Sequence, residues 1–428
     1  MRTLPPGDER DVARVLVLSL VFAPDGVSTA QLMSELAVDL HRAGHQLSVV
    51  TTQPHYNRDM VAEAAQPMTR RWAGLLFRSD FHGIPVIHTA MGRKRGGLSA
   101  RLVGWVRFHA LALVAGLFLV ERPDVILVPS PLLTTGVLGW FLARVRGAAF
   151  VYNVQELYPD FAVRAGQLRH PLVIRLLLAL ERFVYRRASM ITVIGQGMRS
   201  AVVAKGVPPA RVQLIPNFVD VEVLRPGPMD NAFRREHDLG HAFVVTYAGN
   251  MGLAQGLDVV IDAAELLANE PDVLFLFVGD GVLRERLMAR AKGLDNTRFV
   301  IHQPYARVPE IYAASNLCVV AMIGNVAAEA VPSKFLRIMA CGRPVLALAD
   351  AQSDLAREVT AAGAGVVASP SSAESVAQAV LAFRDAPERC EATGTAGRAY
   401  VSLHYARAVV TRRYASLLRD LARHKVTR

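Results

Sequence analysis

The sequence predicts an α/β protein of two domains, each built on a doubly wound parallel sheet. A chain of 428 residues exceeds what one hydrophobic core usually supports, so we expect two domains of roughly 200 residues each. An apolar strand, a glycine-containing turn and an amphipathic helix follow one another at 15–45 and again at 244–267. The stretch 328–347 predicts a loop, a short helix and a buried strand, which together form the usual anion site of such a sheet.

The charge of the chain is unevenly divided. Residues 1–225 hold 26 Lys and Arg against 16 Asp and Glu, whereas 226–428 hold 22 against 21. A basic first half predicts an anionic partner on that side. The basic residues are scattered among long aliphatic runs and form no recognisable nucleic-acid-binding module. We therefore expect an anionic membrane surface and no nucleic acid.

The cysteines and the opening of the chain bear on location. Cys318, Cys341 and Cys390 have no metal-ligand spacing, and the first two lie in apolar segments, which favours buried free thiols and a reducing cytoplasm. The charged opening GDERD runs directly into a strand-like segment, which is not typical of a secretory signal. We expect a cytoplasmic protein that is peripheral on the inner face of the cytoplasmic membrane.

The first domain is expected to begin with a strand at 15–22, followed by the turn 23–29 and a helix that starts at Thr29. The second strand is predicted in LSVVTT. Further along, a strand and loop are predicted at 150–160 and a long helix at 171–188.

The apolar run 103–120 has the length of a membrane span, but Arg107 and His109 interrupt it and a strand follows after three residues. It must therefore belong to the first domain. One interpretation is a helix that simply packs on the core. The other, which we favour, is a helix that also presents an apolar face to lipid, because tryptophans and arginines nearby supply interfacial anchors (Trp72, Trp105 and 93–95).

The second domain is predicted to follow a linker at 225–228. Its first strand, glycine loop and helix lie in 244–267, and a strand with a Gly-Asp-Gly turn lies in 275–287. The tail is helical in pattern, and its last helix is expected at 403–423.

The short helix of 328–347 carries a lysine in its first turn. Ser333 is a candidate N-cap, and Lys334 follows it. A cation in the first turn opposes the helix dipole, so Lys334 suits this position when an anion shares the site. Taken alone, the stretch is explained equally well by an ordinary connecting helix with a surface lysine.

The neighbouring residues carry a family resemblance. Glu329 lies eight positions before Arg337, and AE-x7-RIMACGRPV resembles the donor-site motif of the retaining GT-B glycosyltransferases of family 4, Glu-x7-Glu followed by a small-residue helix and Gly-x-Pro-Val. Glu329 matches the first glutamate. Arg337 stands at the second, which in the family usually holds the ribose hydroxyls. The resemblance extends in order and spacing over about 15–421.

The resemblance implies a GT-B fold, in which two Rossmann-like domains face each other across a cleft. It implies an acceptor-binding domain at 1–224, a nucleotide-sugar-binding domain at 225–402, and a C-terminal helix at about 403–428 that crosses back to the first domain. Within the family, the bacterial enzymes that build exopolysaccharide or O-antigen units resemble this sequence most.

The resemblance also implies the site residues. Glu329 would hold donor-sugar hydroxyls and Lys334 would stabilise the leaving diphosphate. The other donor-binding positions are Gly249, Asn250, Gln255, Gly256, Gly279, Asp280, Gly281, Tyr305, Pro332, Ser333 and Arg337. Asn250 and Gln255 stand where the family usually has an arginine and a lysine. The acceptor or sugar side would include Gly26, Ser28, Thr29, Gln155 and Glu156.

The expected function is sugar transfer of the hexosyl or N-acetylhexosaminyl type, with retention, from a UDP-sugar to a lipid-linked or other glycan. We expect no cofactor, and no bound metal because the sequence has no Asp-x-Asp placed after a strand. Two alternatives remain open. A nonhydrolysing nucleotide-sugar epimerase shares the fold, and a non-catalytic subunit of a glycan-assembly complex would explain the departures at 155, 250, 255 and 337.

Overall fold

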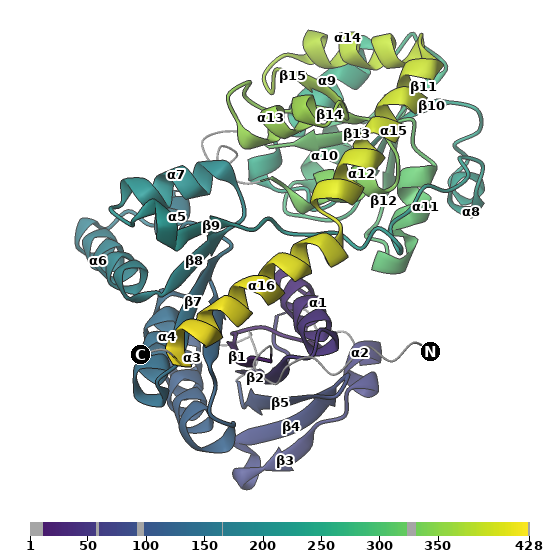
Figure 1. The fold of residues 1–428 in the computed structure, drawn as a ribbon. Helices are drawn as coiled ribbons and strands as arrows, with labels where there is room; N and C mark the ends of the chain where they lie inside the picture. The colour runs from purple at the N-terminus through teal and green to yellow at the C-terminus, as the bar shows by residue number, and fades with distance from the viewer. Residues whose placement is uncertain (1–11, 57–59, 92–97, 165, 323–330, 427–428) are drawn as a thin grey trace. The chain divides into compact units, whose positions relative to one another are not determined.

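The computed structural model describes residues 12–56, 60–91, 98–164, 166–322 and 331–426 (Figure 1). The chain divides into two compact units. Unit 1 contains residues 1–194, 199–215 and 411–428, and unit 2 contains residues 195–198 and 216–410. The contact boundary at 215/216 thus lies before the predicted one at 224/225. The predicted α/β class with parallel sheets is confirmed.

Unit 1 is built on a sheet with the order β3-β4-β5-β2-β1-β6-β7-β8-β9 among the described residues. The central strand β1 pairs in parallel with β2 and β6, and β4 pairs in antiparallel fashion with β3 and β5. The strands are β1 (Arg14–Leu18), β2 (Gln46–Thr52), β3 (Thr69–Arg71), β4 (Leu76–Phe81), β5 (Ile84–Thr89), β6 (Val125–Pro129), β7 (Ala149–Val154), β8 (Met190–Val193) and β9 (Val212–Leu214).

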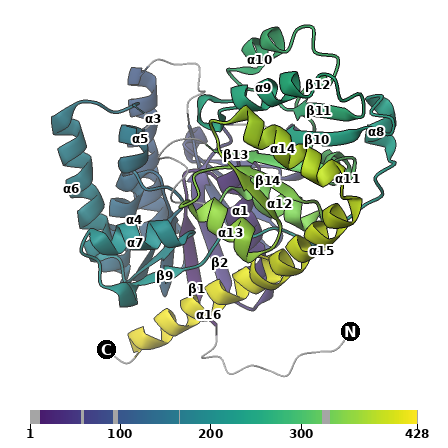
Figure 2. The same ribbon diagram turned by 90° about the horizontal axis from the view of Figure 1, so that it is seen from above.

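Helices cover both faces of this sheet (Figures 1 and 2). Tyr152 of β7 lies 6.1 Å, between ring centroids, from Tyr185 of α6. The side-chain carboxamide nitrogen of the next residue, Asn153, donates to the Tyr414 hydroxyl of α16 (Arg407–Val426) at 2.9 Å. Because successive strand side chains point to opposite faces, α6 and α16 lie on opposite sides. The helices of this part are α1 (Ser28–Arg42), α2 (Met60–Ala65), α3 (Leu98–Val114), α4 (Leu133–Arg146), α5 (Asp160–Arg164), α6 (Pro171–Arg187) and α7 (Gln196–Ala204).

The apolar run 103–120 is helical, as predicted. It forms most of α3 and the π-helical turn η3 (Ala115–Leu119). Phe108, Ala112 and Ala115 are buried against the unit, so the segment is part of its core. In the described part of the chain, no helix is both long enough and apolar enough to cross a membrane.

Unit 2 contains a parallel sheet with the order β12-β11-β10-β13-β14-β15 among the described residues. Its strands are β10 (Phe243–Ala248), β11 (Val273–Val278), β12 (Thr297–Val300), β13 (Leu317–Ala321), β14 (Val345–Leu348) and β15 (Gly365–Ala368). The residues of β11, β13 and β14 are all buried, because helices pack on both faces of the sheet.

The helices of unit 2 form two layers. One apolar cluster joins the sheet to α9 (Asp258–Leu266), α10 (Arg284–Arg290) and α14 (Ala373–Arg384). The other clusters join it to α8 (Ala232–Glu236), α11 (Val308–Ala313), α12 (Ser333–Ala340) and α13 (Asp354–Ala361). Helix α12 buries Phe335, Leu336 and Met339, so its position relative to the strands is set by packing.

The single C-terminal helix predicted at about 403–428 is instead the end of one helix and the whole of another. Helix α15 (Pro387–His404) stops before Tyr405, and α16 (Arg407–Val426) begins after Ala406. The carbonyl of Tyr405 accepts from the amide of Val219 at 3.0 Å, and the Val219 carbonyl accepts from the Arg407 amide at 2.9 Å. The helix is interrupted between His404 and Arg407 because the backbone there forms hydrogen bonds with Val219, a distant residue in the sequence. Residues 411–428 group with unit 1.

Candidate functional site

Two glycine loops follow β10 and β11 in unit 2 and stack directly on each other. Gly249, Gly279 and Gly281 have φ of 144°, 140° and 152°. A Cβ at Gly279 would lie 2.1 Å from the carbonyl oxygen of Gly249, and a Cβ at Gly281 would lie 2.5 Å from that of Met251. The Met251 amide donates to the carbonyl of Asp280 at 2.8 Å. Glycine is therefore required here by both the backbone angles and the close approach.

The loop after β10 is held by its own side chains. The Gln255 carboxamide oxygen accepts from the amide of Gly252 at 3.1 Å, and the carbonyl of Asn250 accepts from the Tyr247 hydroxyl at 2.6 Å. Gly256, with φ of 56°, closes the loop before α9 begins. The predicted donor positions 250, 255 and 256 thus shape the loop. Tyr247 is not among the residues that the sequence singled out.

Helix α12 brings its N-terminus to the same end of the sheet. The helix begins at Ser333, and Pro332 occupies the N-cap position without a side-chain hydrogen bond. The prediction that Ser333 is the N-cap is therefore wrong, because Pro332 already has the extended conformation of a cap, with ψ of 138°, and Ser333 is the first helical residue. In the part of the chain that the structure describes, the N-cap residue therefore gives the first amides of α12 no side-chain hydrogen bond.

Lys334 extends from the first turn of α12 to the loop after β10. Its Nζ donates to the Tyr247 hydroxyl at 2.8 Å and lies 4.1 Å from the centroid of that ring. A Cβ at Gly249 would lie only 2.8 Å from Nζ, so this glycine also makes room for the lysine. Burial, together with the charge of Arg337, lowers the pKa of Lys334 to about 7.

Arg337 lies one turn further along α12, on the side of Tyr305. Its guanidinium carbon is 5.1 Å from the centroid of the Tyr305 ring, which is a cation–π contact. Tyr305 begins the short helix η6 (Tyr305–Arg307) after β12. The structure therefore brings together Lys334, Arg337, Tyr305 and the two glycine loops. Glu329, the first glutamate of the motif, lies outside the described residues.

The predicted residues of unit 1 lie near the carboxyl ends of its strands. Ser28 and Thr29 begin α1, and Gly26 is exposed in the turn before it. Thr29 lines a cavity of about 230 Å³ together with residues that follow β1, β2 and β6, among them Leu20, Tyr56, Ser130 and Pro131.

Gln155 and Glu156 directly follow β7 and are tied to the loop after β6. The hydroxyl oxygen of Ser130 accepts from the amides of Gln155 at 2.9 Å and Glu156 at 3.1 Å. The Gln155 side chain donates to the carboxamide oxygen of Asn153 at 2.7 Å. Burial raises the pKa of Glu156. The sequence analysis did not single out Ser130, although the sequence Pro-Ser-Pro at the end of a strand indicates a loop.

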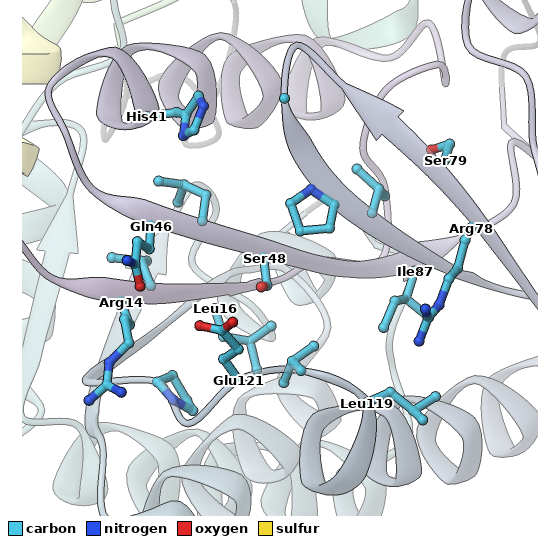
Figure 3. Close-up of a pocket in the computed structure, with 17 residues that line it drawn as sticks. Arg14, Leu16, His41, Gln46, Ser48, Arg78, Ser79, Ile87, Leu119 and Glu121 are labelled. Atoms are coloured by element: carbon cyan, nitrogen blue, oxygen red, sulfur yellow. The ribbon is translucent and has the colours of Figure 1, made fainter.

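A second cavity of unit 1, of about 440 Å³, lies elsewhere (Figure 3). Arg14, Gln46 and Ser48 line it at the amino ends of β1 and β2, with Arg78 and Glu121 nearby. Ligands of open α/β sheets bind outside the carboxyl ends of the strands. None of the residues predicted from the sequence lines this cavity. It is therefore not a candidate for the main site.

Two models of known protein families match consecutive parts of the chain. Residues 27–217 match the glycosyl transferase 4-like domain, and residues 230–400 match the glycosyl transferases group 1 domain. A candidate colanic acid biosynthesis glycosyl transferase of Escherichia coli K12, WcaI, is 27% identical over 85% of this chain and 90% of its own length. A candidate glycosyltransferase of Pseudomonas aeruginosa, WbjE, is 27% identical over 70% of this chain and 76% of its own.

Solved structures share the fold at low sequence identity. HepE of Anabaena, solved in complex with UDP, superposes with a TM-score of 0.70 at 17% identity and covers 95% of this chain and 100% of its own. The same protein solved in complex with UDP-glucose superposes with a TM-score of 0.70 at 18% identity over 95% of this chain and 100% of its own. At this identity the likeness shows the fold.

The stacked loops predict a large cost for any side chain at Gly279. Gly279→Ala should lower the free energy of unfolding by about 3 kcal/mol or more, because positive φ and a backbone clash act together. Gly293→Ala is the matched control, since Gly293 has φ of 93° and open space around its Cβ position. The control substitution should lower the free energy of unfolding by only about 1 kcal/mol. Equal losses in chemical denaturation would contradict the close approach of the loops.

Proposed function

The chain belongs to the family-4 glycosyltransferases of GT-B fold, and from this premise we propose that it transfers a sugar from a UDP-sugar to a lipid-linked glycan during synthesis of a cell-surface polysaccharide. The observation that carries the proposal is the convergence of two glycine-containing loops, the first turn of α12, whose N-cap Pro332 makes no side-chain hydrogen bond, and Lys334 at one end of the unit 2 sheet. A helix N-terminus next to a lysine is suited to binding a diphosphate. The colanic acid assignment of one relative and the UDP complexes of HepE support the substrate classes.

The diphosphate would be bound mainly by backbone amides and by Lys334. Free amides at a helix N-terminus bind anions, and the helix dipole adds to their effect. When the bond between the anomeric carbon and the diphosphate breaks, negative charge grows on the leaving oxygen. Lys334 and the first turn of α12 would stabilise that charge, an electrostatic contribution to catalysis.

In the proposed reaction the acceptor hydroxyl oxygen bonds to the anomeric carbon, and a nucleoside diphosphate and a proton are released. Retention of configuration, independence of metal ions, and transfer of a hexosyl or N-acetylhexosaminyl group are parts of this proposal. We assign no protein nucleophile. Glu329 would hold hydroxyls of the donor sugar.

The acceptor is proposed to bind at the carboxyl ends of the unit 1 strands. The cavity there combines apolar residues with the polar groups of Thr29 and Ser130. Gln155 and Glu156, which the Ser130 hydroxyl holds in place, would hydrogen-bond sugar hydroxyls. Such a mixture of apolar surface and a few fixed polar groups is typical of small-molecule sites.

Helices α3 and α6 support attachment to a membrane surface. Val103, Val106 and Phe118 are 67%, 71% and 75% exposed along α3 and η3, and Leu172 and Leu176 of α6 are 66% and 68% exposed. Exposed arginines accompany the leucines on α6 and just before it (Arg169, Arg175 and Arg182). Apolar anchors next to basic side chains are typical of interfacial helices.

The inner side of α6 is fixed to unit 1, so the exposed side is available. Glu181 of α6 is buried and accepts from Lys205 Nζ at 2.6 and 2.7 Å. The same Nζ lies 2.7 Å from the Asp160 carboxylate of α5. Trp72 is 49% exposed and belongs to the proposed surface, whereas Trp105 is only partly exposed. The basic cluster 93–95 lies outside the described residues.

The whole proposal is tested by incubating the purified protein with UDP-sugars and a membrane lipid extract and analysing the products by mass spectrometry. A glycosylated lipid and free UDP are expected. Interconversion of the UDP-sugar without a lipid product would support an epimerase instead, and absence of turnover would support a non-catalytic subunit.

Lys334→Ala should weaken binding of UDP by roughly 2–3 kcal/mol, or about 30- to 150-fold, because a hydrogen-bonded charge is lost from a desolvated site. Isothermal titration calorimetry measures this change. Lys292→Ala removes an exposed lysine of the same unit and should bind UDP normally. If both variants keep wild-type affinity and fold normally, the donor site has been placed wrongly.

The wild-type protein should sediment with phosphatidylglycerol vesicles more than with phosphatidylcholine vesicles, and less so as salt rises. The double variant Leu172→Ser, Leu176→Ser should lose at least about tenfold in vesicle affinity, since each exposed leucine can bury its side chain in lipid. A control double variant, Leu266→Ser with Leu403→Ser, removes exposed leucines of unit 2 and should bind as the wild type does. Equal binding by both double variants would rule out the α6 surface.

Arg337→Glu should weaken UDP binding about tenfold or more, although it restores the family motif. The reason is that Arg337 is proposed to serve the diphosphate in place of the cations missing at 250 and 255. Calorimetric titration with UDP separates the outcomes, with the exposed Arg413→Glu as a control for charge reversal. Tighter binding would indicate a restored ribose contact and refute the proposed role. Unchanged binding would place Arg337 outside the site.

A further inference from the structure

The Tyr247 hydroxyl connects the two anion-binding elements of unit 2. Tyr247 is 1% exposed and packs in the apolar cluster that includes α9, α10 and α14. Lys334 instead comes from α12, whose apolar residues pack in the cluster on the other layer. The hydroxyl donates to the Asn250 carbonyl at 2.6 Å and accepts from Lys334 Nζ at 2.8 Å. One oxygen atom thus holds both the glycine loop and the lysine.

The direction of these hydrogen bonds follows from the chemistry of the groups. Burial raises the pKa of Tyr247, so its hydroxyl keeps its proton. That single proton is used on the Asn250 carbonyl oxygen, which can only accept. Lys334 must therefore donate to a lone pair of the hydroxyl oxygen. Both an ammonium group and a neutral amine can do this.

The described surroundings of Lys334 compensate a positive charge poorly. Among the described residues, no carboxylate forms an ion pair with Lys334, and the charge acting on it is that of Arg337, which repels it. The groups that face this charge pair are neutral tyrosines from three other elements: Tyr247 of β10, Tyr305 of η6 and Tyr312 of α11. The hydroxyl and the ring of Tyr247 are the favourable contacts.

We propose that Tyr247 is a positioning residue whose hydroxyl holds Lys334 beside the glycine loop, and that binding of the donor diphosphate protonates the Lys334 that is present as the neutral amine, with the proton taken from solvent. This inference rests on the proposed function. The amine gains its third N–H bond, which then donates to a phosphate oxygen. In the absence of donor the site carries less charge, so burying Lys334 costs less.

The pH dependence follows from the lowered pKa of Lys334, which is about 7. Below this pH the ammonium form is already present, and binding needs little proton uptake. Above it, binding must protonate the amine, so affinity for the diphosphate should fall by up to about tenfold for each pH unit. At pH 7 binding should take up about half a proton.

The uptake is measured by titrating UDP into the protein between pH 6 and pH 9 in buffers of different ionisation enthalpy. Lys334→Arg is the matched variant, because arginine stays charged throughout this range. The terminal phosphate of UDP also titrates, but it contributes equally to both proteins. The number of protons taken up on UDP binding should be larger for the wild type than for Lys334→Arg. The difference should be near half a proton at pH 7 and approach one proton at pH 9. A difference of zero would overturn the inference.

The role of Tyr247 is tested with Tyr247→Phe, which keeps the ring and removes the bridging hydroxyl. UDP binding should weaken about five- to tenfold at pH 7. Because the ammonium loses an acceptor, the decline in affinity should also begin at lower pH than in the wild type. Tyr152→Phe is the control, since the Tyr152 hydroxyl is buried in unit 1 without a hydrogen-bond partner in the described structure.

The outcomes separate this inference from the proposed function. If Tyr247→Phe lowers the affinity for UDP by the same factor at every pH, Tyr247 has a merely structural role and the inference is overturned. If Tyr247→Phe fails to fold, the comparison of wild type with Lys334→Arg still decides whether the lysine takes up a proton. If the wild type binds neither UDP nor GDP, the proposed function fails, and the inference fails with it.

Discussion

The close approach of two backbone loops is the constraint on which the unit 2 site depends. Gly279 and Gly281 lie against the carbonyl oxygens of Gly249 and Met251 at distances that no Cβ atom could occupy. This contact draws the loops after β10 and β11 together at the carboxyl end of the sheet. Lys334 fits against the first of these loops because residue 249 is also glycine.

Positive charge in this site is concentrated on one helix. In the family the loop after β10 usually supplies two cations, but here Asn250 and Gln255 take their places, and the Gln255 side chain is used to hold Gly252. Lys334 and Arg337 both project from α12, and Arg337 lies over Tyr305. Two cations on one short helix repel each other, which helps to lower the pKa of Lys334 to about 7. A bound diphosphate relieves this repulsion.

Unit 1 combines a cavity of apolar residues and a few polar groups with exposed leucines on α6. Ser130 organises the loops after β6 and β7 by accepting from two consecutive amides, and its neighbours line the cavity. On the outside, Leu172 and Leu176 remain exposed although the inner side of α6 is fixed by the buried Glu181. Both features suit a lipid-linked sugar, because its sugar part requires hydrogen bonds and its lipid part requires an apolar surface.

The sequence by itself determined the α/β class, the strand–loop–helix units such as β10 and α9, and the positions of the glycine loops that we propose to lie at the anion site. These depend on local periodicity and on glycines, which are visible in any short window. Only the tertiary structure decided which groups meet. Tyr247 and Lys334 are 87 positions apart. The predicted helix at 403–428 was divided because Tyr405 and Arg407 pair with the distant Val219. Contacts between remote segments override local pattern, since a buried backbone or side-chain polar group must find a partner wherever the fold places one.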